Sequence, residues 1–168
     1  MSEIVLFRID QIVLTLFIGL LVYAALRDIC TYTISNTLNL TIAVFFPLYA
    51  LLSPHAIDWS GTFIVTGIVF IVGVILFALR ALGGGDVKLL TAAALWAGPG
   101  AIFEFLLVTT LTGGVMALVM SSRSRFTLAT ALETLGSQSA SKAVLSHVLP
   151  YGVAIAAGGI AVAAKLWV

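Results

Sequence analysis

Long apolar runs alternate with short polar segments along most of the chain. Six such runs predict helices at residues 12–26, 38–52, 62–79, 87–97, 101–120 and 148–167. A helix needs about 20 mostly apolar residues to cross a bilayer, so these runs, with a few residues added at their edges, are typical of membrane spans. The run at 87–97 is short, and we expect its polar start to lie in protein or water rather than lipid.

The composition agrees with a membrane environment. Of 168 residues, 61% are hydrophobic and only 9% are charged, and the mean hydropathy is +1.20. Soluble domains carry about a quarter charged residues, and no water-soluble core of this size buries so much apolar surface. A net charge of +1 leaves no basic surface for nucleic acid. We therefore predict an all-α polytopic membrane protein with about six transmembrane helices, a single domain over residues 1–168 surrounded by the lipid bilayer.

The basic residues indicate how the spans are oriented. Alternating the loops between two sides places six of the eight basic residues together: Arg27, Arg80, Lys88, Arg123, Arg125 and Lys142. Because lysine and arginine accumulate in cytoplasmic loops, we expect this side to be cytoplasmic and both termini to lie outside. The long loop 121–147 is then cytoplasmic, as either a short interfacial helix or a polar connector. An aromatic belt is expected on the outer side, formed by Trp59, Trp96 and Trp167.

Two aspartates stand at span ends on the predicted cytoplasmic side. Asp28 follows the first span within RDICTYTISN, and Asp86 opens the fourth within GGGDVKLL. Acids near hydrocarbon are costly and usually serve ion passage, proton relay or catalysis. Two neighbouring carboxylates that share one proton supply a base for water and an acid for the leaving group, which suffices to hydrolyse a peptide bond. The alternative is that each aspartate caps a helix or pairs with a nearby basic residue.

Three consecutive glycines, Gly83, Gly84 and Gly85, directly precede Asp86. They remove side chains where a backbone turns sharply or where a peptide approaches closely, although a flexible turn between two spans is the simpler alternative. Asp86 is expected near a helix N-cap, at the positive end of the dipole, with Lys88 close by. On this basis we expect Asp86 to be the readily ionised member of the pair, and the other aspartate, at a helix end, to hold the shared proton.

These motifs resemble a known family. GGGDVKLL resembles the glycine–aspartate signature of membrane aspartic peptidases of the type IV prepilin peptidase and presenilin-like group. RDICTYTISN is similar to the segment around the other catalytic aspartate of prepilin peptidases, whose Asp, Ile and Asn match Asp28, Ile34 and Asn36, while Ser35 replaces the usual proline. LPYGVAIAAG, residues 149–158, resembles the family's segment that opens the last span, and LWAGPG resembles the short Flp/Tad-pilus branch.

The resemblance implies an aspartic endopeptidase that removes the short leader of pilin precursors at the cytoplasmic face of a bacterial or archaeal inner membrane. Its catalytic residues would be Asp28 and Asp86, without metal or cofactor, and its partners the pilin precursor and the pilus assembly machinery. The residues expected to shape the site are Gly83, Gly84, Gly85, Lys88, Asn36, Tyr151 and Gly152.

Larger members of the family carry an N-terminal region with four cysteines that also N-methylates the pilin. This chain has one cysteine, Cys30, so the peptidase-only form is expected. Two functions of other classes stay open at the sequence level. One is a small proton-coupled transporter that uses the two aspartates as a relay, and the other is a scaffold subunit of a secretion complex.

Overall fold

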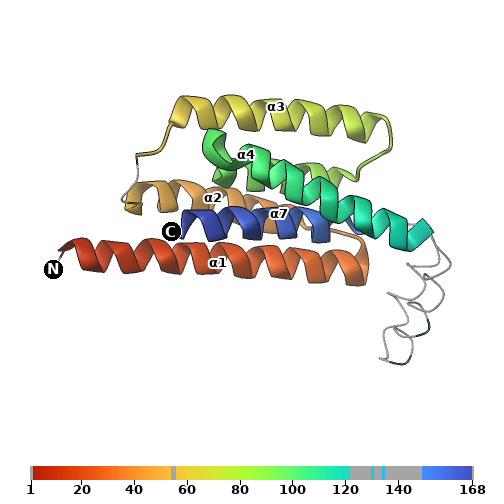
Figure 1. Ribbon diagram of the computed structural model, residues 1–168, viewed down its shortest axis with the longest axis horizontal. Helices are drawn as coiled ribbons and strands as arrows, with labels where there is room; N and C mark the ends of the chain where they lie inside the picture. The colour runs from red at the N-terminus through yellow and green to blue at the C-terminus, as the bar shows by residue number, and fades with distance from the viewer. Residues whose placement is uncertain (1, 54–55, 122–129, 131–133, 135–148, 168) are drawn as a thin grey trace.

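The computed structural model describes residues 2–53, 56–121, 130, 134 and 149–167, and all of its regular elements are helices. These are α1 (Ser2–Thr31), α2 (Asn36–Leu52), α3 (Trp59–Ala78), α4 (Gly84–Ser121) and α7 (Tyr151–Leu166), arranged as a bundle (Figure 1). The predicted all-α class is confirmed. Most of the predicted loop 121–147 lies outside the described residues.

Polar residues at the helix starts explain why two of these helices begin where they do. Ser35, the residue that replaces the family's usual proline, is the N-cap of α2, and its hydroxyl accepts the Leu38 amide at 3.2 Å. Asp58 caps α3 and accepts the Gly61 amide and the Ser60 hydroxyl, each at 2.9 Å. The hydrogen bonds from Gly61 and then Ser60 lower the pKa of Asp58 below its ordinary value. Asp58 therefore has a local structural role.

Helix α4 is kinked at Gly98, where φ is 50° and ψ is −172°, in the left-handed half of backbone space that favours glycine. Its first arm starts beside the end of α3, since Gly84 packs against Phe77. The kink lies beside the start of α3, where Gly98 packs against Thr62. The predicted run 87–97 is therefore the first arm of α4, antiparallel to α3.

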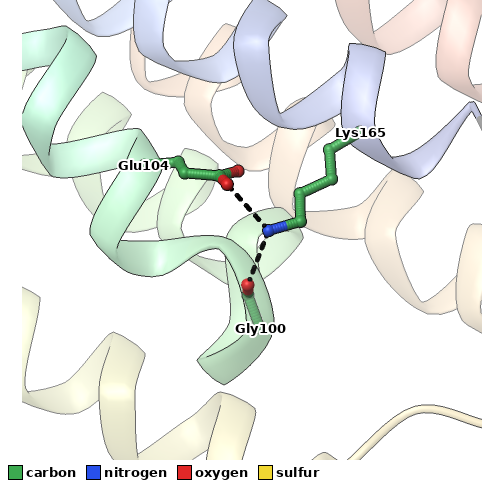
Figure 2. A network of polar contacts seen from close by, with 3 residues as sticks. All are labelled: Gly100, Glu104 and Lys165. Carbon is green, nitrogen blue, oxygen red and sulfur yellow. Dashed lines mark hydrogen bonds and ion pairs between the residues drawn. The ribbon is translucent and has the colours of Figure 1, made fainter.

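The second arm of α4 returns along α7. Gly113 packs against Ala154, and Gly158 packs against Phe105, so the predicted runs 101–120 and 148–167 lie antiparallel to each other. Figure 2 shows how this pair is joined near the kink. Lys165 donates to the Glu104 carboxylate at 2.9 Å and to the Gly100 carbonyl at 3.1 Å. The far end of α7 is thereby tied to the start of the second arm.

Helix α3 has the polarity expected of a helix in lipid. Its buried side carries small and hydroxyl residues together with one valine: Thr62, Thr66, Val69 and Gly73. Its exposed side carries large apolar residues, among them Phe63, Ile64, Ile68 and Ile71. A Cβ at Gly73 would lie 2.9 Å from Val87 of α4, so the glycine permits close approach of the two helices. Small residues inside and large apolar residues outside are typical of membrane helix packing.

Three helices are long and apolar enough to cross a bilayer, over Ile9–Thr31, Trp59–Ala78 and Gly84–Ser121. Helices α2 and α7 are apolar but shorter. The length and apolar composition of these helices are those of an integral membrane protein. The full arrangement of six spans with both termini outside stays a prediction.

The core around Trp96 joins α1, α2 and α4. The indole stacks on Phe17 with ring centroids 4.0 Å apart, lies 5.4 Å from Tyr49, and donates through Nε1 to the Ile42 carbonyl at 3.0 Å. Trp96 is only 2% exposed. The expected place for Trp96 in an outer aromatic belt is therefore wrong, because its ring is used in helix packing.

Candidate active site

A cavity of about 780 Å³ lies where α1 and α3 end and α4 and α7 begin, at the right-hand end of the bundle in Figure 1. Asp28 and Asp86 both line it. They come from different helices and are separated by more than fifty residues, yet they are near enough for the charge on Asp28 to act on Asp86. The structure therefore brings together the two aspartates that the sequence singles out.

Asp28 is held by the start of α7. Its side chain is buried, with 4% of the residue exposed, and Oδ2 accepts the Gly152 amide at 2.7 Å. Amides in the first turn of a helix have no acceptor within that helix, so this bond satisfies both groups. A Cβ at Gly152 would lie 2.8 Å from Oδ2 and 2.9 Å from the Cβ of Asp28. Only glycine permits this approach without displacement, so Gly152 lies beside Asp28 for a steric reason.

Asp86 stands in the first turn of α4. Its Oδ2 accepts the Gly83 amide at 3.2 Å, and a Cβ at Gly83 would lie 2.8 Å from the same oxygen. Among the described glycines only Gly98 has a positive φ, so left-handed backbone does not explain the triple glycine. Gly83 instead leaves room for the Asp86 carboxylate, while Gly84 and Gly85 form the first turn of α4.

The structure removes the basis for the expected ionisation of the pair. The sequence predicts that Asp28 holds the shared proton because it lies near the C-terminal end of a helix, α1. In three dimensions its carboxylate also meets the N-terminal turn of α7, where amide donors favour the ionised form. The amide bond to Asp28 is buried and is shorter than the one to Asp86. The helix dipoles alone therefore do not distinguish the two aspartates, and the expected ionisation of the pair stays a prediction.

Asn36 and Lys88 do not line this cavity within the described part of the chain. Lys88 donates to the Asn36 side-chain oxygen at 2.7 Å, and both residues line a separate groove of about 410 Å³ formed by α2, α3 and α4. Asn39, which sequence reasoning missed, donates to the Gly85 carbonyl at 3.3 Å. These bonds tie α2 to the start of α4, so they position the turn that carries Asp86.

Tyr151 lines the cavity, as expected, and two further residues that sequence reasoning missed line it as well. These are Tyr32, which directly follows α1, and Arg80, which lies two residues after the end of α3. Burial raises the pKa of Tyr32 above its ordinary value, and the nearby charge of Asp28 raises it further. The signal available in the sequence was only their position just after an apolar run.

The cavity offers two carboxylates, each with an amide donor, together with phenol groups and a guanidinium. No group of three or more His, Cys, Asp or Glu side chains comes together among the described residues. The carboxylate pair is the natural proton donor and acceptor of this site, and the arrangement suits hydrolysis by an activated water molecule.

Comparison with known proteins identifies the family. The model of the type IV leader peptidase family matches residues 15–118, which is more than half of the chain and includes both aspartates. No curated protein and no solved structure matches the chain. The chain therefore belongs to the type IV leader peptidase family and is an integral membrane peptidase of the prepilin-leader type.

Proposed function

We propose that the protein is an aspartic endopeptidase, with Asp28 and Asp86 as its catalytic residues, which removes the leader from pilin precursors. The observation that carries this proposal is the convergence of the two carboxylates on one cavity from separate helices. Membership of the leader peptidase family supports the substrate class. Hydrolysis by such a pair needs water, which the proposed position of the cavity at an end of the spans would supply.

The mechanism follows from the two carboxylates. In the resting pair, the ionised carboxylate accepts a proton from water while the water oxygen attacks the scissile carbonyl carbon. The protonated carboxyl of the partner donates its proton to the leaving nitrogen as the C–N bond breaks. The proton taken from water remains on the first aspartate, so the pair still holds one proton. Before the next turnover this proton returns to the partner aspartate, or the two aspartates exchange the roles of acid and base. We assign Asp28 as the base because the buried Gly152 amide favours its ionised form.

We propose that the cavity faces the cytoplasm and that both termini lie outside, across six spans. Helix α1 begins and α7 ends at the same end of the bundle, opposite the cavity (Figure 1). The basic residues that predict the cytoplasmic side include Arg80, which lines the cavity. A precursor's basic leader would then stay in the cytoplasm while its apolar helix lies beside the spans, and the whole chain would act as one membrane-embedded peptidase domain.

The decisive experiment replaces each aspartate by asparagine, which keeps the size of the side chain but removes the ionisable group. We expect Asp28→Asn and Asp86→Asn each to abolish leader cleavage of a co-expressed pilin precursor, with membrane insertion unchanged. Because the pair acts as a unit, the double variant should lose no more than either single one.

Asp58→Asn is the matched control, since Asp58 is an exposed capping residue at the opposite end of the bundle. It should retain cleavage. A scaffold would tolerate all three substitutions, and cleavage by either catalytic-site variant would contradict the proposal. Proton uptake into vesicles that depends on both aspartates, without cleavage, would instead favour the transporter.

A further inference from the structure

Backbone strain is concentrated at the cavity. Among the described residues, Tyr32 and Arg80 are the non-glycine residues with positive φ, at 51° and 59°. Both line the cavity that holds Asp28 and Asp86. The left-handed conformation is costly for a residue with a Cβ, and most of all for bulky side chains. Such strain persists where the surroundings impose it, and it is enriched at functional sites.

Helix termination explains the conformation of Tyr32 but not its identity. Its amide donates to the Asp28 carbonyl at 2.9 Å and closes the last turn of α1. The chain then leaves towards Ile34, which is buried and packs against Gly85. Glycine or asparagine makes the same left-handed helix ending at lower cost. A tyrosine at this position therefore needs a reason beyond the turn.

The phenol of Tyr32 is placed to act in the cavity. The residue is partly buried and lines the cavity together with Asp28 and Asp86. Because burial and the charge of Asp28 raise the pKa of Tyr32, the phenol keeps its proton throughout the neutral pH range. Tyr32 therefore supplies a protonated hydroxyl on the wall of the cavity that the two carboxylates also line.

We propose that Tyr32 is a third catalytic residue, whose hydroxyl donates a hydrogen bond to the scissile carbonyl oxygen as water adds to the carbon. The new bond joins the water oxygen to the carbonyl carbon, and the C=O π electrons move to the oxygen, where the phenol stabilises the charge. The phenol keeps its proton, so the carboxylate pair carries all proton transfers. This inference rests on the proposed peptidase activity.

The test is Tyr32→Phe, which keeps the ring and the backbone and removes only the hydroxyl. Loss of one donor to a developing oxyanion costs about 10²- to 10³-fold in kcat, so we expect a loss of this order with KM for a precursor peptide nearly unchanged. The loss should be equal from about pH 5 to about pH 9, because the phenol is protonated throughout. A peptide with a hydroxyl-bearing tetrahedral carbon in place of the scissile amide should bind the variant about tenfold or more weakly.

Three further variants make the result specific. Tyr23→Phe, on the same helix but exposed to the surroundings, should behave as wild type. Tyr151→Phe removes the hydroxyl of the other tyrosine that lines the cavity, and it should lower kcat less than Tyr32→Phe does. Tyr32→Asn relieves the left-handed strain, so it should unfold at a higher temperature than wild type and still lose activity, which separates catalysis from folding.

Unchanged kcat in Tyr32→Phe would overturn the inference, as would a loss confined to KM or a larger loss in Tyr151→Phe. Failure of the underlying function looks different. In that case wild type does not cleave, or cleaves equally well without Asp28 and Asp86. Cleavage that depends on both aspartates but not on the Tyr32 hydroxyl would refute the role of Tyr32 alone.

Discussion

At the scale of single residues, the two aspartates depend on glycines that leave space for them. The amide of Gly152 donates a hydrogen bond to Asp28, and the amide of Gly83 donates one to Asp86. A Cβ added at either glycine would lie within 3 Å of the carboxylate that it binds. The requirement is steric in both places, and neither glycine has a positive φ. A Cβ at Gly152 would also lie 2.9 Å from the Cβ of Asp28. That atom is fixed to the backbone of α1, so it can move away only if α1 moves.

Gly152→Ala should therefore impair the site while the bundle stays folded. The added methyl must push α7 or Asp28 away, and the carboxylate loses the hydrogen bond that favours its ionised form. We expect kcat/KM to fall about tenfold or more and the acidic limb of the pH–rate profile to move to higher pH, if Asp28 is the base. Leader cleavage by purified protein, followed across pH, measures both effects.

Gly114→Ala is the matched control, because a Cβ at Gly114 meets nothing within 4 Å. It should leave rate and pH profile unchanged. A Gly152→Ala variant with the wild-type acidic limb would argue that Asp86, rather than Asp28, is the base.

At the scale of elements, the kink in α4 determines how the bundle closes. The first arm begins at the cavity with Asp86 and runs away from it along α3, and the second arm returns along α7 to the level where Gly152 meets Asp28. The reversal occurs at Gly98 and is secured by Lys165, Glu104 and Gly100 (Figure 2). The kink lies at the end of the molecule opposite the cavity, so we expect it to affect the stability of the fold rather than catalysis.

Gly98→Ala should destabilise the fold more than it affects catalysis. Alanine at a positive φ costs about 1–3 kcal/mol, and its Cβ would lie 3.1 Å from the Thr62 hydroxyl. We expect the free energy of unfolding in detergent to fall by about this amount, with cleavage per folded molecule close to wild type. Gly100→Ala, whose Cβ meets nothing within 4 Å, provides the comparison and should be nearly neutral. Equal stability of the two variants would show that the kink is not strained.

At the scale of the whole molecule, the orientation in the membrane decides whether the cavity can meet a cytoplasmic leader. Cys30 follows Asp28 by two residues near the end of α1 and is exposed. In intact spheroplasts it should be protected from a membrane-impermeant maleimide and become labelled after permeabilisation.

Ser60→Cys in a Cys30→Ser background should show the reverse pattern, because Ser60 begins α3 at the opposite end of the bundle. Labelling of Cys30 in intact spheroplasts, together with protection at position 60, would invert the topology and separate the cavity from cytoplasmic substrates.

The sequence by itself determined the helical class, the membrane setting, the family and the two aspartates. Each of these depends on residues that are close together in the sequence. The signals are apolar runs long enough to form spans and an aspartate in a short motif at the end of a span. The glycine motif also indicated the start of α4 correctly, although for a different reason than backbone freedom.

The tertiary structure decided which side chains and amides from different helices contact one another. In the sequence Asp28 is near only the end of α1, yet the amide that binds its carboxylate comes from α7, 124 residues away. Asn36 and Lys88 belong to the two aspartate motifs in sequence, but they bond to each other outside the cavity. Tyr32, which follows α1 in the left-handed conformation, lines the cavity. Contacts of this kind depend on how separate helices pack, and the spacing of residues within one segment does not encode them.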